Sequence, residues 1–536
     1  MAKPHIRPRA SASAGAVLRP QAGNAYDAAY ARGGEMSIWT PPRRSADAEI
    51  LPNWGSLVAR ARDLDRNNPV ARSMRQTSVD NVVGIGPMLM SDPDYGALGI
   101  TQDQAAEWAE MLERRFHAWW WSWACHAGDC LTGGQLTQLA KSAMIMNGDA
   151  LSLPLWLPDA GDGYATKLQM IEADRLSNPN GQSDSRRLRG GIELDDYGRP
   201  LAYHIKSGHP GDAEIAGYDA PFDKWERIAR RTEFGRLQVI HLYDPERSPQ
   251  SRGKPLLTTI IPELKNVDRY KRAEIVAAVR NADVAGIITT PLGAEDVVSL
   301  FQSNSEAYLK ARRDHAVGLE SGTLLALMPG DDFKSHAPTR PAQQFGAFIE
   351  NCLRIASCGA EIPYELVVKD FTKLTYSGGR MMVLEAWRSF NRQRDILATG
   401  WLDPILGLLA EEEVYARRIS APGFIEDPVR RRAWLRCQWI FPGRGWVDPV
   451  KESAGAAMRM QNYLTTLAKE CAEQGLYWRD VLRQQKIERD FMQKLGLPLP
   501  QSMSVSVRAN PSEPANDAPA PNNDTQAAGA MIEVAA

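Results

Sequence analysis

Apolar and polar positions predict a mixture of helices and strands in the first half of the chain. Thr101-x-x-Gln104 has the pattern of a capping box, and the apolar residues that follow recur at helical spacing as far as Trp119. A second helix is expected from Gln135 to Met146, because Asn147-Gly148 is a typical helix end. Strands are expected where apolar residues alternate, at 151–157, in a hairpin at 191–205 and at 237–243. Residues 50–250 are therefore predicted to be α+β.

The next part of the chain is predicted to contain two helices on either side of a small mixed segment. A long helix is expected from about Pro255 to Ala282, followed by a strand at 284–290. The residues from Phe345 to Ala356 repeat at helical spacing and end near Gly359. No such period continues through 362–379, which is predicted to be an exposed loop.

Long helices dominate the prediction for the last part. A helix from about 380 to 417 is expected to bend at Asp403-Pro404, because proline disturbs a helix interior. A strand follows at 434–441, and two helices, 449–474 and 477–494, complete the ordered part. The tail at 501–536 is rich in Ala, Pro, Asn and Asp and is predicted to be disordered, as is the basic arm at 1–24.

Size and charge restrict the class of protein. With 536 residues the chain is long enough for three to four domains or one elongated protomer. Its 63 basic and 65 acidic residues give a net charge of −2, which excludes the strongly basic field of a high-affinity duplex binder while allowing local basic patches. There is no apolar stretch of membrane-spanning length and no apolar core of a secretion signal, so neither a membrane segment nor a signal is expected.

Motifs for catalysis and metal binding are almost absent. Gly253-Lys254 is followed by Pro255 and lacks the first glycine of a phosphate loop. Ser377 has Thr375 where a nucleophile elbow needs glycine. Six cysteines are too few for a disulfide scaffold, and Cys125-His126-x3-Cys130 has no second half-site, so reduced thiols, no metal and no cofactor are expected. An uncharacterised soluble hydrolase that uses Ser377 or an Asp pair stays open as an alternative function.

Two surface or core clusters each allow two interpretations. The tryptophans at 119–121 and 123 favour a core or a subunit interface over stacking on bases. The run Arg430-Arg431-Arg432 favours a solvated face or an ion pair between subunits over contact with phosphate.

Several short runs, in order along the chain, carry a resemblance to a known family. They are Arg66–Pro69, Val79–Gly84, Glu172–Leu176, Gly191–Glu193 with Gly198–Pro200, His241–Leu257, Tyr376–Trp387 and Trp446–Glu452. In this order, the chain resembles the portal proteins of lambda-type tailed bacteriophages and prophages from about residue 25 to 500. The family is not enzymatic, which agrees with the missing catalytic motifs.

The resemblance implies a portal fold with an α/β wing, long stem helices, a small mixed clip, a kinked long helix and a helical crown. Carried over by order, the parts are a wing at 25–254, stem helices at 255–283 and 341–359, a clip at 284–340, a tunnel loop at 362–379, the long helix and wing return at 380–446, and the crown at 447–496.

The resemblance also implies the function. Such proteins form rings of twelve copies at one capsid vertex, through which double-stranded DNA is packaged and ejected without sequence specificity. The implied partners are the terminase large subunit, head-completion proteins, and the major capsid and scaffold proteins. The protein would lie in the virion, and in the bacterial cytoplasm during assembly. Another ring-forming connector of the virion is a further alternative, although such connectors are usually much shorter.

The candidate DNA-channel residues flank the expected tunnel loop. Lys369, Lys373 and Arg380 would make transient contacts with phosphate, and Ser377-Gly378-Gly379 would give the loop mobility. Strong phosphate contacts would trap DNA, because each bound cation adds a counterion-release contribution to affinity. Ordinary solvation of loop lysines and arginines is an equal alternative for these three cations.

Overall fold

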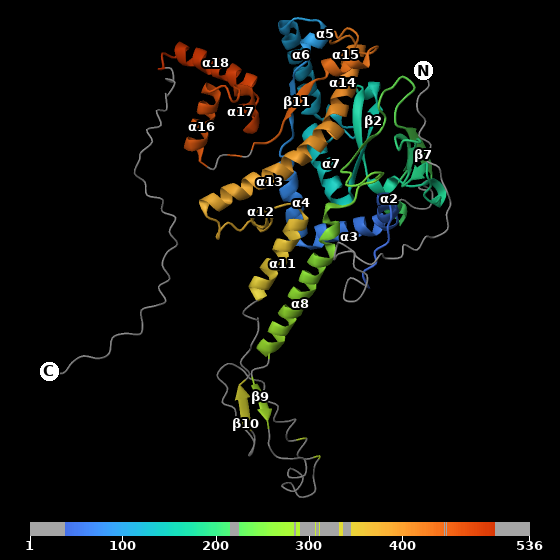
Figure 1. The fold of residues 1–536 in the computed structure, drawn as a ribbon, viewed down its shortest axis with the longest axis vertical. Coiled ribbons are helices and arrows are strands. Elements are labelled where there is room, and N and C mark those ends of the chain that lie inside the picture. Colours follow the sequence, from blue (N-terminus) through green and yellow to red (C-terminus); the bar gives the residue numbers. More distant parts are fainter. Residues whose placement is uncertain are drawn as a thin grey trace, which may run out of the picture.

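The computed structural model describes residues 38–214, 224–283, 286–289, 332–335, 345–443 and 448–498, with the single positions 306, 310 and 445. These residues form a broad body, an antiparallel pair of helices that projects from it, and a group of three helices beside it (Figure 1). The predicted arm at 1–24, most of the predicted clip at 284–340 and the tail at 501–536 lie outside the described residues.

Helices from both halves of the chain build the body. Before the projecting pair they are α2 (Ala46–Ile50), α3 (Trp54–Asn67), α4 (Pro69–Val82), α5 (Tyr95–Leu98), α6 (Gln102–Trp120) and α7 (Gly133–Asn147). After it they are α12 (Tyr364–Val368), α13 (Tyr376–Leu397), α14 (Asp403–Tyr415) and α15 (Pro428–Trp434). The projecting pair is α8 (Ile261–Asp283) and α11 (Phe345–Gly359), and the group beside the body is α16 (Pro449–Gln461), α17 (Leu467–Glu473) and α18 (Trp478–Lys494).

The described strands form small antiparallel sheets. One has the order β3-β2-β8, from Thr166–Ile171, Asp149–Trp156 and Ile240–Tyr243, and another has β4-β5-β6-β7, from Leu188–Arg189, Ile192–Leu194, Pro200–Lys206 and Trp225–Ala229. The remaining pairs are β1 (Met88–Ser91) with β11 (Cys437–Ile440), and β9 (Gly286–Thr289) with β10 (Asp332–Ser335) beyond the end of α8. The α+β prediction for residues 50–250 is therefore confirmed.

Capping residues explain the helix bounds in the body. Thr101 and Gln104 form the predicted capping box of α6, and Thr132 with Gln135 forms another that starts α7 at Gly133, two residues earlier than predicted. At the end of α7, Gly148 has φ of 84°, and a Cβ there would lie 2.4 Å from the carbonyl carbon of Gly253. Glycine is therefore required by both the turn and the close approach of the two backbones.

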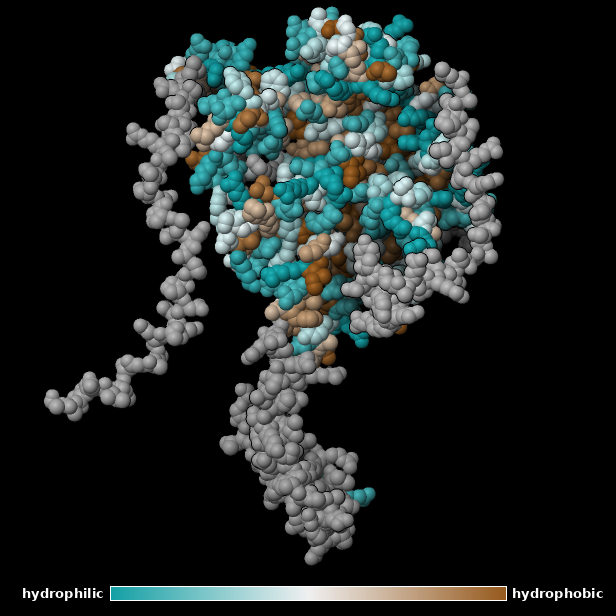
Figure 2. Space-filling view, in the orientation of Figure 1, coloured by the Kyte–Doolittle hydropathy of each residue, from teal (hydrophilic) through white to brown (hydrophobic). Residues whose placement is uncertain are grey.

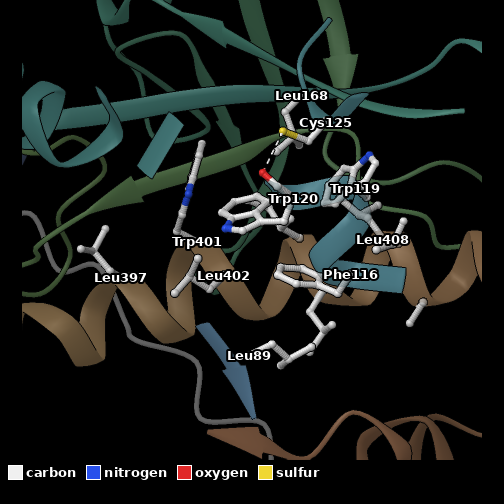
Figure 3. Close-up of a cluster of buried hydrophobic side chains, with 14 of the residues drawn as sticks. Leu89, Phe116, Trp119, Trp120, Cys125, Leu168, Leu397, Trp401, Leu402 and Leu408 are labelled. Carbon is white, nitrogen blue, oxygen red and sulfur yellow. Dashed lines mark hydrogen bonds between the residues drawn. The ribbon is translucent and has the colours of Figure 1, made fainter. Parts of the chain in front are cut away.

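The tryptophan cluster is mostly core. Trp119 and Trp120 are fully buried against Phe116 of the same helix and against Trp401, which comes from the far half of the chain (Figure 3). The Cys125 thiol donates to the Trp120 carbonyl at 3.7 Å, so this cysteine belongs to the same core. Trp123 is the exception, because it is 58% exposed. Residues 386–440 thus complete the core begun by residues 82–168.

The long helix after residue 376 has an irregular turn before the predicted bend. A π-helical turn at Ala398–Leu402 separates α13 from α14, and Pro404 is the second residue of α14, directly after this turn. A Cβ at Gly400 would lie 2.6 Å from Leu242 Cδ1, so the irregular turn brings the helix backbone close to β8.

Four sequence predictions are wrong in detail. Pro154 lies in a central strand rather than an edge strand, and is tolerated there because β8 pairs only with residues 149–152. The strand predicted at 434–441 begins at Cys437, since α15 occupies the preceding residues. The helix predicted over 449–474 is broken after Gln461, where Tyr463 has φ of 57°. Cys358 is exposed, although its helix pattern suggested a core position.

Candidate functional site

The candidate channel residues lie where α11, α12 and α13 meet, on the side of the body from which the helix pair projects (Figure 1). The predicted loop at 362–379 is not a loop throughout. Pro363 precedes the short helix α12, Lys369 ends it in the left-handed conformation with φ of 58°, and α13 begins at Tyr376. Within this range, only residues 362–363 and 369–375 lie outside a helix.

The glycines that were expected to give mobility are helical. The Gly378 N–H donates to the Thr375 side-chain oxygen at 3.2 Å, which makes Thr375 the N-cap of α13. Ser377, Gly378 and Gly379 consequently lie in its first turn. The signal for this start was Thr375, a short polar residue three positions before the first glycine of the pair, and the two glycines obscured it.

The three candidate cations have different surroundings. Lys373 Nζ lies 3.0 Å from both carboxylate oxygens of Glu350 on α11. This bond holds the pKa of Glu350 below its usual value, and Arg354 adds to the effect. Lys369 and Arg380 are exposed and form no ion pair within the described residues. The structure thus brings Lys373 onto the helix pair and leaves the other two in solvent.

Acidic groups weaken the positive field of the segment. The Thr372 hydroxyl donates to Asp370 Oδ1 at 2.6 Å, and this hydrogen bond lowers the pKa of Asp370, so the carboxylate stays charged. Asp370 and Glu350 therefore offset part of the charge of the neighbouring lysines. Such a segment can attract phosphate weakly but is not built to hold it.

A polar junction behind α13 was missed by the sequence analysis. Arg392 donates to Asp244, which follows β8, at 2.8 Å and to Glu361, which follows α11, also at 2.8 Å. Lys141 of α7 is buried beside these groups, and desolvation lowers its pKa to about 8. Lys141 lies four residues from Thr137 and four from Ile145, and both of these are buried. Its position on the same face of α7 was the sequence signal that this lysine is buried.

Ser377 has no catalytic partner among the described residues. Ser377 Oγ lies 3.5 Å from the Thr375 hydroxyl, and no described histidine or carboxylate bonds to it. Asp331 lies outside the described residues, and so do the contacts of the Asp332 side chain.

One group of possible metal ligands occurs among the described residues, and it fits a hydrogen-bonded cluster better. Glu172, Asp174 and His209 have ligand atoms within 4.8 Å of one another. The Gly211 N–H, however, donates to His209 Nδ1 at 3.0 Å, so a neutral ring carries its proton on Nε2. That nitrogen faces Glu172 at 3.0 Å and has no free lone pair for a metal.

The cysteine–histidine run at 125–130 and two arginines of the run at 430–432 make contacts within the subunit. Cys125 Sγ donates to backbone oxygens, and only Cys130 lies near His126, with Sγ 3.4 Å from Nδ1. Arg430 donates to the Leu98 carbonyl at 3.0 Å, and Arg431 pairs with Glu411 at 2.7 Å. No helix in the described part of the chain is both long and apolar enough to cross a bilayer.

Comparison with known families decides between the remaining functions. Residues 32–394 match the family described as phage portal protein, lambda family. The chain belongs to this family of portal proteins. The match covers the body as far as Arg394 in α13, together with the helix pair and the segment with Lys369 and Lys373.

Individual portal proteins are similar along nearly the whole chain. Portal protein B of Escherichia phage lambda is 27% identical over 489 residues, which are 87% of this chain and 90% of that protein. The portal protein of Escherichia phage N15 is 27% identical over 504 residues, covering 89% and 92%. A protein in the neck of an empty gene transfer agent particle aligns with a TM-score of 0.44 and 15% identity, over 79% of this chain and 94% of that one.

Membership in the portal family settles the class of function. Portal proteins are structural components of the virion and assemble as rings in its particles, and they are not enzymes. The hydrolase alternative is therefore wrong, and the connector alternative is replaced by the portal itself.

Proposed function

We propose that twelve copies of the chain form a ring at one capsid vertex, and that double-stranded DNA passes through its axial hole during packaging and ejection. The observation that supports this most directly is the family match over residues 32–394, which includes both projecting helices. A head-to-tail interface that closes on itself makes a ring with a central hole. A net charge of −2 suits a conduit in which DNA must slide.

The parts of the fold are assigned to the parts of a portal on this proposal. The body is the wing, α8 and α11 are the stem, and α16–α18 are the crown. The strands β9 and β10 belong to the clip, and the segment 369–375 is the tunnel loop. Figure 1 supports the assignment, since the stem leads away from the body toward β9 and β10.

The partners follow from these parts. The terminase large subunit would dock at the clip during packaging and be replaced there by head-completion proteins. Capsid and scaffold proteins would contact the wing, and assembly would take place in the bacterial cytoplasm. The chain has no phosphate-loop motif for ATP, so the energy for packaging would come from the terminase.

Native mass tests the ring. Twelve chains of 59.4 kDa give a particle of about 713 kDa. We expect this mass, or one within a subunit of it, with a central hole in negative-stain images of the same fraction. Monomers or dimers that persist when scaffold protein is added would refute the proposal.

Transient phosphate contact by the tunnel loop is tested separately. Replacing Lys369, Lys373 and Arg380 together by Ala should leave assembly intact and impair packaging or retention of DNA. Lys373 is expected to contribute less than the other two, because Glu350 already pairs with it. A matched control removes three exposed cations of the wing at Arg186, Arg199 and Lys224. Unchanged packaged genome length in the loop variant would refute this role.

A further inference from the structure

The two stem helices pack against each other along one face of each. Leu264 and Val267 of α8 and Leu353 and Ala356 of α11 are buried. Nearer the tip, the ring centroids of Tyr270 and Phe345 lie 5.7 Å apart. These contacts define the inner face of each helix.

Each helix also has an apolar strip that the described chain leaves at least half exposed. The α8 strip consists of Ile275, Val276 and Val279, which are 52%, 50% and 55% exposed. The α11 strip consists of Phe348 and Ile355, which are 50% and 64% exposed. One edge of Phe348 contacts Tyr270 of α8, with ring centroids 5.1 Å apart, and the rest of its ring is in solvent. Figure 2 shows apolar residues where the projection leaves the body. Apolar surface of this kind on a projecting element is typical of an interface.

Helix geometry places the two strips on opposite sides of the pair. Successive residues of an α-helix are rotated by about 100° around its axis. For a viewer at the body, this rotation is clockwise along α8, which runs away from the viewer, and anticlockwise along α11, which runs back toward the viewer. At that step the α8 strip lies about 100° clockwise of the inner face of α8, and the α11 strip about 120° clockwise of the inner face of α11. Because the inner faces point toward each other, turning in the same sense leads to opposite sides.

This arrangement identifies the occupant. A two-fold dimer uses the same patch on both partners and would leave the other strip in water. A copy added head to tail covers both strips, since the α8 strip of one copy meets the α11 strip of the next. Removing this apolar surface from water is favourable, and a ring repeats the contact at every interface between copies.

We infer that the α8 strip is the docking surface for the α11 strip of the neighbouring copy, and that this contact joins the stems of adjacent subunits. The inference rests on the proposed ring and names the residues through which it closes.

Chemical cross-linking tests the contact and its direction. In a background with the exposed Cys130 and Cys358 changed to Ser, we would combine Val276→Cys with Ile355→Cys and treat assembled protein with a bifunctional maleimide. The double variant should give a ladder of covalent oligomers that extends toward the full ring. Each single variant should give no more cross-linking than the background, because each cysteine would face a neighbour without one.

A matched control and a direct mass measurement distinguish failure of the stem contact from failure of the proposed ring. Asn266 is exposed on α8, outside the strip and ten residues from Val276, so Asn266→Cys with Ile355→Cys should give no ladder. Covalent dimers from either single variant would show a two-fold contact and overturn the inference. Rings of about 713 kDa that give no ladder would overturn it while leaving the proposed function intact. Absence of such rings in the unmodified protein when scaffold protein is present would instead refute the proposed function.

Discussion

Replacing Lys141 by Met should stabilise the protein at neutral pH. Lys141 is fully buried, and burial lowers its pKa from 10.5 to about 8. The nearby charges act in both directions, since Asp244 and Glu361 favour the ammonium group and Arg392 opposes it. Methionine fills a similar volume without a charge, so the cost of burying the cation is removed.

The magnitude follows from the pKa. One pKa unit is worth about 1.4 kcal/mol, so a fall from 10.5 to about 8 corresponds to a cost of about 3 kcal/mol at pH 7. Between pH 8 and 10.5 the unfolded chain binds more protons than the folded chain, so the stability of the parent protein rises with pH. The advantage of Lys141→Met should therefore shrink to about 2 kcal/mol at pH 9.

Urea unfolding at pH 7 and pH 9 checks both statements. Lys224→Met is the matched control, because Lys224 is exposed and loses no hydration in the folded protein. We expect the control to change stability by less than about 0.5 kcal/mol at either pH. A Lys141→Met protein that is no more stable than the parent at pH 7, or whose advantage does not change with pH, would refute the reasoning.

Three further substitutions test the packing of the body. Gly133→Ala should lower the free energy of unfolding in urea by about 3 kcal/mol, because its Cβ would lie 1.9 Å from a buried tryptophan ring. Gly55→Ala is the control: its Cβ would have nothing within 4 Å, so the higher helix propensity of alanine should raise the free energy of unfolding by up to about 1 kcal/mol. Arg394→Met should cost about 3 kcal/mol and lower the melting temperature, since three backbone carbonyls lose their donor. Tyr477→Phe removes a hydroxyl 2.9 Å from both oxygens of Glu113, whose pKa burial already raises; the expected loss of about 1 kcal/mol should be greater at pH 8 than at pH 5, where more of this carboxyl is protonated.

The sequence predicted those elements whose signals are local. The box at Thr101 and Gln104 and the apolar period after it identify α6, and the repeat from Phe345 gives both ends of α11. The break near Tyr463 was missed because the left-handed residue there is not glycine, so nothing in the composition marked it.

The candidate site was predictable as chemistry but not as geometry. Lys369, Lys373 and Arg380 are evident as cations near a helix start. The pairing of Lys373 with Glu350 joins residues of different helices, and no spacing rule in the sequence connects them. The same is true of Arg392, whose two carboxylate partners follow other elements.

The offset between the two apolar strips of the stem has a consequence for the channel wall. Tyr270 is level with Phe345, so at about 1.5 Å per residue Val276 lies roughly 9 Å toward the tip and Ile355 roughly 15 Å toward the body. Subunits related by pure rotation lie at one height along the axis. Strips at different heights on one pair can therefore meet only if the pairs lean sideways around the ring. The lining of the channel would then be a set of oblique ridges, so that DNA passing through crosses successive helices at an angle and meets no groove running parallel to its path.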